Sequence, residues 1–274
     1  MLVRGFQVGA LSEYSVLMLV GALSSLWLYG VLAARAGVGS RAIHLQLLLV
    51  PVACAAGVRL LFYAQHNLIL GDRTAPLLSG EGTGHFGVLL LGALCVAAVR
   101  RLTRADAAAT WDAWAVPLCL AIAWGRLACF TAGCCFGTPA ELPWSVCYPG
   151  AGSPGESPAF RSHLAAGWVD AATATSLSVH PTQLYLALWA AATGLFLWAL
   201  SRRAGWRGAL FPLFLLLHCS GRFLLEHLRG DERGVLGGLH FEHIYSLIGM
   251  GVAARWLLAA LRAHQSIAIQ RETR

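Results

Sequence analysis

Long apolar runs separated by short polar connections dominate this sequence of 274 residues. A helix that crosses a bilayer needs about 20 largely apolar residues. Seven stretches meet this requirement to within a few residues, namely 14–34, 43–64, 84–99, 112–132, 181–200, 208–225 and 243–261. We therefore predict an all-α polytopic membrane protein, with seven transmembrane helices in a single membrane domain that covers residues 1–274.

The charge content supports this prediction. Charged residues make up 12% of the chain, whereas a soluble domain carries about 25%. The composition therefore argues against a soluble enzyme, a disordered chain and a nucleic-acid-binding domain. The formal net charge is +7, and all 20 basic residues are Arg. A basic balance can indicate nucleic acid, but here the Arg residues lie between apolar runs, as they do at the cytoplasmic edge of membrane proteins.

The connections between the runs predict an orientation. Positive charge follows spans one, three, five and seven, at Arg35, Arg41, Arg100, Arg101, Arg104, Arg202, Arg203, Arg207, Arg262, Arg271 and Arg274. The other connections are mixed or acidic. Because cytoplasmic loops are enriched in basic residues, the N-terminus is predicted outside and the C-terminus in the cytoplasm.

One connection is much longer than the others. Residues 133–179 separate spans four and five and contain several Pro, Gly and Ser residues and two Trp residues. In the predicted orientation this segment lies outside the membrane. We interpret it as a small ordered head or lid inserted within the membrane domain.

Three arginines occur inside the predicted spans, at Arg59, Arg126 and Arg222. Arg126 and Arg222 lie about 14 residues beyond the inner ends of their spans, which places both roughly 20 Å up at a rise of 1.5 Å per residue. Each could extend to the headgroups. Together, with few carboxylates in the spans, they favour an anionic ligand such as a phospholipid phosphate, which a guanidinium binds through two hydrogen bonds.

Further polar side chains are predicted at the same level, at Tyr14, His85, His180 and His243. His85 lies in Gly84-His85-Phe86-Gly87, where flanking glycines allow a ligand or backbone to approach closely. Its imidazole could accept a proton near neutral pH. The alternative is a histidine that only hydrogen-bonds a backbone carbonyl.

Several of these residues belong to motifs that resemble those of prolipoprotein diacylglyceryl transferases. The motifs, which extend over nearly the whole chain, are Tyr14 before Leu19-Val20-Gly21, Gly57-Val58-Arg59-Leu60, Gly84-His85-Phe86-Gly87, Gly125-Arg126-Leu127 with Phe130 and Gly133 to Gly137, His180-Pro181-Thr182-Gln183-Leu184-Tyr185, and Gly221-Arg222-Phe223 with Glu226, Arg229 and Asp231. The set is specific together, although no single motif would be.

The resemblance implies an enzyme of the bacterial inner membrane. Such an enzyme moves the diacylglyceryl group of phosphatidylglycerol to the cysteine thiol in a prolipoprotein signal peptide, forming a thioether and releasing glycerol phosphate. It implies that Arg126 and Arg222 stabilise the departing phosphate and that His85 is the base. Substrate-binding positions carried over from the family are Tyr14, Arg59, Gly137, His180, Gln183, Tyr185, His218, Glu226 and Arg229. Neither a metal nor another cofactor is required.

The chain departs from the family pattern at four positions. Cys129 stands in place of Asn, Cys134 in place of Glu, His218 in place of Tyr and Leu186 in place of Glu. These departures leave two alternatives open. One is a paralogue that moves a lipid group to another acceptor. The other is a non-catalytic lipid-binding or redox membrane protein that uses Cys134, Cys135 and Cys147.

The cysteines of Gly133-Cys134-Cys135-Phe136-Gly137 have no CxxC spacing. Disulfides persist outside the cell, so one hypothesis is a bridge from Cys134 or Cys135 to Cys147 across the head. Inert thiols, a reactive thiol beside the lipid site and a soft-metal site are the alternatives. Adjacent cysteines rarely bridge each other without strain.

Overall fold

The computed structural model describes residues 2–3, 7–8, 11–64, 67, 85–153, 156–203, 205–231, 235–236 and 239–272. The regular secondary structure of this part of the chain is helical apart from two small hairpins, and turns and loops join the helices. The helices are α1 (Glu13–Arg35), α2 (Ser40–Tyr63), α3 (His85–Thr103), α4 (Ala107–Ala132), α5 (Pro158–Ala165), α6 (Thr182–Ser201), α7 (Leu210–Glu226) and α8 (Phe241–Glu272). The hairpins pair β1 (Gln7–Val8) with β2 (Leu11–Ser12), and β3 (Val235–Leu236) with β4 (Leu239–His240).

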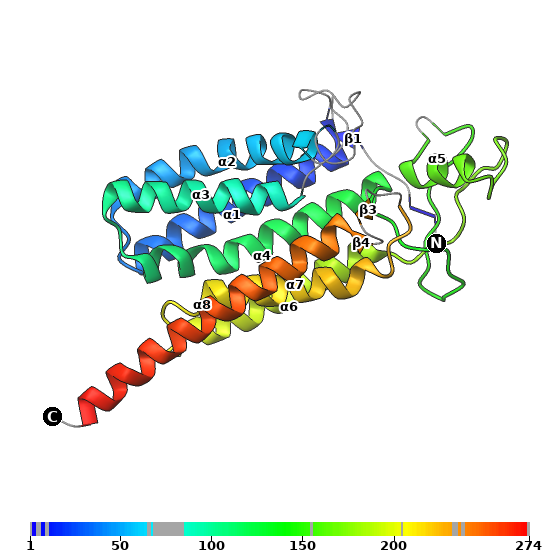
Figure 1. Ribbon diagram of the computed structural model, residues 1–274. Coiled ribbons are helices and arrows are strands. Elements are labelled where there is room, and N and C mark those ends of the chain that lie inside the picture. The colour runs from blue at the N-terminus through cyan, green and yellow to red at the C-terminus, as the bar shows by residue number, and fades with distance from the viewer. Residues whose placement is uncertain are drawn as a thin grey trace.

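The seven long helices form an elongated bundle, and helices that follow one another run in opposite directions (Figure 1). Helix α4 is central, because it packs against α1, α6 and α7. Two further pairs, α2 with α3 and α7 with α8, also pack closely. The last turns of α8 extend beyond the other helices (Figure 1).

Each predicted span corresponds to one of these helices. Helix α4 begins at Ala107, five residues before the predicted boundary, because the Asp106 side chain accepts the N–H of Ala109 at 2.7 Å. This is a side-chain N-cap. Among the described residues, five helices are long and apolar enough to cross a membrane: α1, α2, α4, α6 and α8 over residues 241–265. The fold is therefore that of a polytopic all-α membrane protein.

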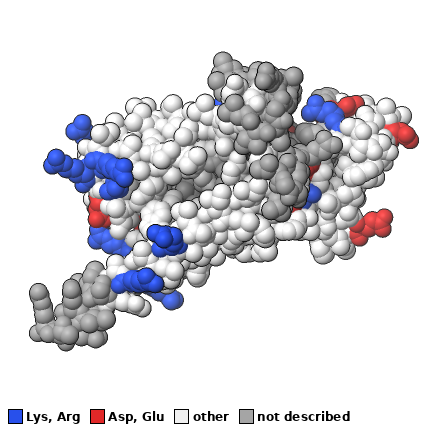
Figure 2. Space-filling model, viewed as in Figure 1, with Lys and Arg blue, Asp and Glu red and all other residues white. Residues whose placement is uncertain are grey.

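The surface of the bundle matches this assignment. Large apolar side chains such as Trp27 and Leu188, both 69% exposed, point away from the bundle. Such a surface is costly in water but suits contact with lipid. In the view of Figure 2, most of the visible Arg side chains gather at the end opposite the head, whereas most of the visible Asp and Glu lie at the head end.

A buried polar group fastens the first helices together. The Gln46 side-chain oxygen on α2 accepts the Tyr29 hydroxyl of α1 at 2.9 Å and the Trp114 indole N–H of α4 at 2.8 Å. The rings of Tyr29 and Trp114 stack with centroids 3.8 Å apart. Because all three side chains are buried, each donor depends on this one oxygen.

Residues 133–179, the head, lie at one end of the bundle and carry α5 (Figure 1). The head has its own small apolar core, formed by Val3, Phe136, Val146, Tyr148, Ala159 and Val179. Ser157 caps the N-terminus of α5, because its hydroxyl accepts the N–H of Phe160 at 3.2 Å. The N-terminal strand segment joins the head, because the N–H of Val3 donates to the Cys147 carbonyl at 3.0 Å.

Candidate active site

An ion pair lies buried near the head end of α7. The Arg222 guanidinium is 2.7 Å from the Glu226 carboxylate, one helical turn away. Arg222 is 1% exposed and Glu226 is 2% exposed. Charges this deep are tolerated only when they are paired and hydrogen-bonded. Glu226 therefore compensates the charge of Arg222 within the same helix.

Arg126 on α4 is also buried, with 7% of its surface exposed. Within the described residues, no carboxylate lies within ion-pair distance of its guanidinium. Arg126 and Arg222, which the sequence places at one depth, both lie near His218. This buried residue of α7 is one on which the positive charges of both arginines act. The His218 ring stacks on Phe214, with centroids 5.7 Å apart.

Helix α1 contributes Tyr14 to this site. It is half-buried in the first turn of that helix, close enough to Arg126 and to the cysteines 129, 134 and 135 for their charges to act on its hydroxyl. The sequence placed Tyr14 and Arg126 at one level, and the structure brings them together.

The end of α7 and the head are fastened to each other beside this group. Arg229 forms a bidentate pair with Asp231, with N–O distances of 2.7 and 2.6 Å. Its backbone pairs with Gly137. A Cβ atom on Gly137 would lie 2.5 Å from the Cβ of His180 and 2.8 Å from the carbonyl oxygen of Leu228. Only glycine fits at this meeting of three segments.

The segment that opens α6 contributes contacts of two kinds. Tyr185 accepts the indole N–H of Trp144 at 2.7 Å and lies 3.3 Å from the His180 ring nitrogen. These two rings are partly exposed. Gln183, in contrast, is fully buried, and its amide donates to the Cys134 carbonyl at 2.7 Å and to the Tyr148 hydroxyl at 3.0 Å. Gln183 therefore holds the head in place through contacts within the chain.

The disulfide hypothesis is wrong in this structure. No disulfide joins any of the eight cysteines, all of which are described. Cys147 lies instead on the segment that pairs with the N-terminus. The thiols of Cys134 and Cys135 turn back toward Cys129, and the three sulfur atoms lie within 4.8 Å of one another. Hydrogen bonds from the Cys129 and Cys134 thiols, and the charges of Arg229 and Arg126, lower the pKa of Cys135.

Two predicted positions lie on the α2–α3 pair. Gly57 of α2 and Gly87 of α3 face each other so closely that a Cβ on either would lie 2.0 Å from the backbone oxygen of the other. This contact brings the Arg59 motif beside the start of α3, and Arg59 is half-buried. His85 is the first residue of α3, but its side chain lies outside the described part of the structure, as does Gly84.

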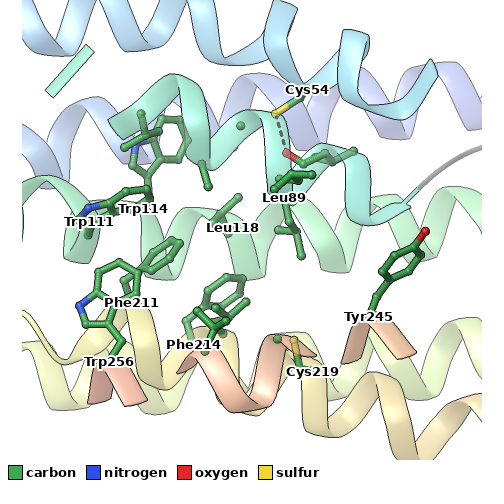
Figure 3. Close-up of a pocket in the computed structure, with 18 of the residues that line it drawn as sticks. Cys54, Leu89, Trp111, Trp114, Leu118, Phe211, Phe214, Cys219, Tyr245 and Trp256 are labelled. Carbon is green, nitrogen blue, oxygen red and sulfur yellow. Dashed lines mark hydrogen bonds between the residues drawn. The ribbon is translucent and has the colours of Figure 1, made fainter. Parts of the chain in front are cut away.

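An apolar cavity of about 400 Å³ lies within the bundle, between α2, α3, α4, α7 and α8. Figure 3 shows Tyr245 toward one end and Trp111 and Trp256 toward the other, with Phe214 and Cys219 between them. Phe214 also stacks on His218, so one wall of the cavity adjoins the residue on which both arginines act. Its size falls in the range of small-ligand pockets, about 300–1,000 Å³.

Comparisons with known proteins place the chain in a family. The family model described as prolipoprotein diacylglyceryl transferase matches residues 4–259. The chain belongs to the prolipoprotein diacylglyceryl transferase family.

Individual relatives agree with this assignment. A phosphatidylglycerol–prolipoprotein diacylglyceryl transferase of Clostridium tetani is 30% identical over 61% of this chain and 60% of its own length. A second such transferase from Streptomyces coelicolor is 28% identical over 94% of this chain and 78% of its own length. One from Corynebacterium glutamicum is 27% identical over 86% of this chain and 74% of its own length.

The structure identifies two neighbours of the site that the sequence analysis did not assign to it. Thr182, one residue after the predicted His180-Pro181 pair, donates its hydroxyl to the Cys135 carbonyl at 2.7 Å. Tyr148 is fully buried beneath Gln183, and burial raises the pKa of its hydroxyl. Thr182 lies inside the His180 to Tyr185 motif and Tyr148 lies in none of the motifs, and neither was assigned to the site because their contacts depend on how the head folds back onto α6. At the departure positions, Cys129 and Cys134 form one group, His218 faces the arginines and Leu186 is buried.

Proposed function

We propose that this chain transfers the diacylglyceryl group of phosphatidylglycerol to the cysteine thiol in the signal peptide of a prolipoprotein. The observation that carries the proposal is Arg126, a buried guanidinium without a carboxylate partner among the described residues. A buried cation in this state requires an anion. The phosphate of an anionic phospholipid supplies one, and the apolar cavity beside His218 offers space for acyl chains.

The chemistry follows from this placement. The acceptor sulfur attacks the glyceryl carbon that carries the phosphate, and the new C–S bond forms as the C–O bond breaks. The electron pair of the C–O bond goes to the departing glycerol phosphate. Arg126 stabilises the charge that develops on this phosphate, with Arg222 beside it, because pre-positioned donors act most strongly in a site that excludes water. The thiol proton goes to a base, for which His85 is the candidate.

The remaining site residues have supporting roles in this proposal. Tyr14 and Arg229 border the proposed phosphate position. The charge of Arg126 acts on the Tyr14 hydroxyl, and the charges of Arg229 and Arg126 both act on Cys135. His180 and Tyr185 form the partly exposed rim on the head side, and His218 lines the arginine pair. Gly137 and Gln183 position the head, while Arg59 borders the start of α3.

We propose the membrane arrangement as well. All seven long helices span the bacterial inner membrane, with the N-terminus and the head outside and the C-terminus in the cytoplasm. The alternation of Arg-rich loops along the chain supports this orientation. It places the Arg126 site in the outer leaflet, where secreted prolipoproteins arrive.

Complementation tests the proposed function. The gene is expressed in a bacterium whose own diacylglyceryl transferase is depleted, and growth and lipoprotein processing are followed. We expect growth and mature lipoproteins with the intact chain, and neither with Arg126→Gln. A chain that is stably inserted in the membrane but restores neither growth nor processing would contradict the proposal and favour a paralogue with another acceptor.

A further inference from the structure

Three cysteine side chains converge where α4 meets the head. Cys129 lies in the last turn of α4, and Gly133, the residue that caps this helix, has a left-handed φ of 69°. Cys135 also has a left-handed φ, 62°, which is uncommon for any residue but glycine. These two turns fold the chain back, so that the sulfur atoms of Cys129, Cys134 and Cys135 lie within 4.8 Å of one another.

Hydrogen bonds from two buried side chains hold this convergence in place. The Thr182 hydroxyl donates to the carbonyl of Cys135 and the Gln183 amide to that of Cys134, both at 2.7 Å. Thr182 and Gln183 are both fully buried. Strained backbone persists only where the surroundings over-determine it. The chain therefore maintains an unfavourable φ at Cys135 in a position that gathers three thiols.

The geometry and the charges suit a thiophilic metal ion. Zn²⁺ binds thiolates at about 2.3 Å in tetrahedral geometry, which sets sulfur atoms about 3.8 Å apart. The three sulfur atoms lie within 4.8 Å of one another, so this separation is compatible with their arrangement. Three thiolates and Zn²⁺ carry one net negative charge. The positive charge of Arg126 acts on Cys129 and Cys135, and that of Arg229 acts on Cys135. The three cysteines are partly exposed rather than buried, so a fourth position can open toward the surface.

We propose that Cys129, Cys134 and Cys135 bind Zn²⁺ and leave its fourth coordination position to the acceptor thiol. Three protein ligands with one open position are typical of catalytic zinc, and a thiol that binds zinc loses its proton. This inference rests on the proposed function. The metal-bound acceptor sulfur, its proton released to the base, would attack the glyceryl carbon while the C–O electron pair leaves with glycerol phosphate. The thioether that forms is neutral and dissociates from the metal.

Metal analysis tests the site independently of turnover. The protein is purified in detergent, and its metal content is measured by mass spectrometry for the wild type, Cys129→Ser, Cys134→Ser, Cys135→Ser and the control Cys147→Ser. Cys147 lies in the same head but outside the group of three. We expect close to one zinc per chain in wild-type and Cys147→Ser protein, and a clear loss of bound zinc in the three other variants. Wild-type protein without zinc, or with Cu(I) in its place, would overturn the proposal. Gel filtration and thermal unfolding verify that each variant is folded.

A second measurement tests the open position. Cobalt replaces zinc, and the thiolate-to-cobalt absorption is recorded as a lipobox peptide is added. We expect the charge-transfer absorption to increase with the cysteine peptide and to stay unchanged with the same peptide carrying Ser. An unchanged spectrum with both peptides would overturn the acceptor role.

Transfer assays on the same samples separate this inference from the proposed function. Chelated protein should lose transfer and regain it with zinc. Undiminished transfer by fully metal-free protein would overturn the metal proposal and leave the transferase function standing. If zinc-loaded wild type binds the peptide thiol at the metal but transfers nothing, the transferase function fails while the metal site stands.

Discussion

Arg222 and Glu226 form a buried ion pair of 2.7 Å within one turn of α7, while Arg126 on α4 has no carboxylate partner among the described residues. The two arginines act on the same His218, so one site contains a compensated and an uncompensated guanidinium. We interpret Arg222 as a residue whose position is fixed by its ion pair with Glu226. We interpret Arg126 as the residue that binds an anionic ligand.

The ion pair predicts a large loss of stability when one partner is removed. Glu226→Gln keeps the shape of the side chain but removes the carboxylate charge that pairs with the buried Arg222. The free energy of unfolding should fall by about 3–5 kcal/mol, measured by thermal unfolding in detergent. Glu141→Gln, at an exposed residue of the head, is the control. An unfolding transition in Glu226→Gln that matches this control would contradict the assignment.

The Gln46 group predicts a second effect on stability. Gln46→Leu removes the oxygen that accepts from both Tyr29 and Trp114. Each buried donor left without a partner costs about 1–3 kcal/mol. A double-mutant cycle isolates the interaction: Tyr29→Phe should destabilise the wild type more than it destabilises Gln46→Leu. Equal costs in the two backgrounds would show that the hydrogen bond contributes nothing.

The close approach at Gly137 predicts that even one methyl group is harmful. In Gly137→Ala the new Cβ would overlap His180 and the Leu228 carbonyl, and overpacking of this kind costs about 1–3 kcal/mol. Because Gly137 joins the head to the end of α7, transfer should fall along with the unfolding temperature. Gly39→Ala is the matched control, since nothing lies within 4 Å of its Cβ position. Wild-type behaviour in Gly137→Ala would contradict the packing.

The proposed topology predicts the location of reporter fusions. Fusions after Arg104 and Arg203 should report the cytoplasm, and a fusion near Gly152 in the head should report the exterior. An external signal at Arg203 would rule out the seven-span arrangement.

The helices and the meeting of Arg126, Arg222 and Tyr14 could be predicted from the sequence, because run length and a constant rise per residue determine both. The pairing of Arg222 with Glu226 follows from the spacing of one helical turn. The position of the Cys134 and Cys135 thiols beside Cys129 could not be predicted. This position depends on the left-handed backbone at Cys135 and on the hydrogen bonds that the buried side chains of Thr182 and Gln183 donate. No local pattern in the sequence encodes either of these contacts.

The buried polar side chains show the same limit. Gln183 was assigned to substrate binding through its motif, yet its amide is occupied by the Cys134 carbonyl and the Tyr148 hydroxyl. Gln46 drew no attention within its apolar run, although it links three helices. In both cases the partner is more than 15 residues away in sequence, where periodicity carries no information.

The central claim is that Arg126 binds the lipid phosphate during transfer. It is tested most directly by the rate at which purified protein in detergent transfers labelled diacylglyceryl from phosphatidylglycerol to a lipobox peptide. Arg126→Lys keeps the charge but loses the planar pair of donors, so the rate should fall by about 100- to 1,000-fold. Arg101→Lys, at an exposed residue in the last turn of α3, should keep the wild-type rate. A near-normal rate in Arg126→Lys would contradict the account.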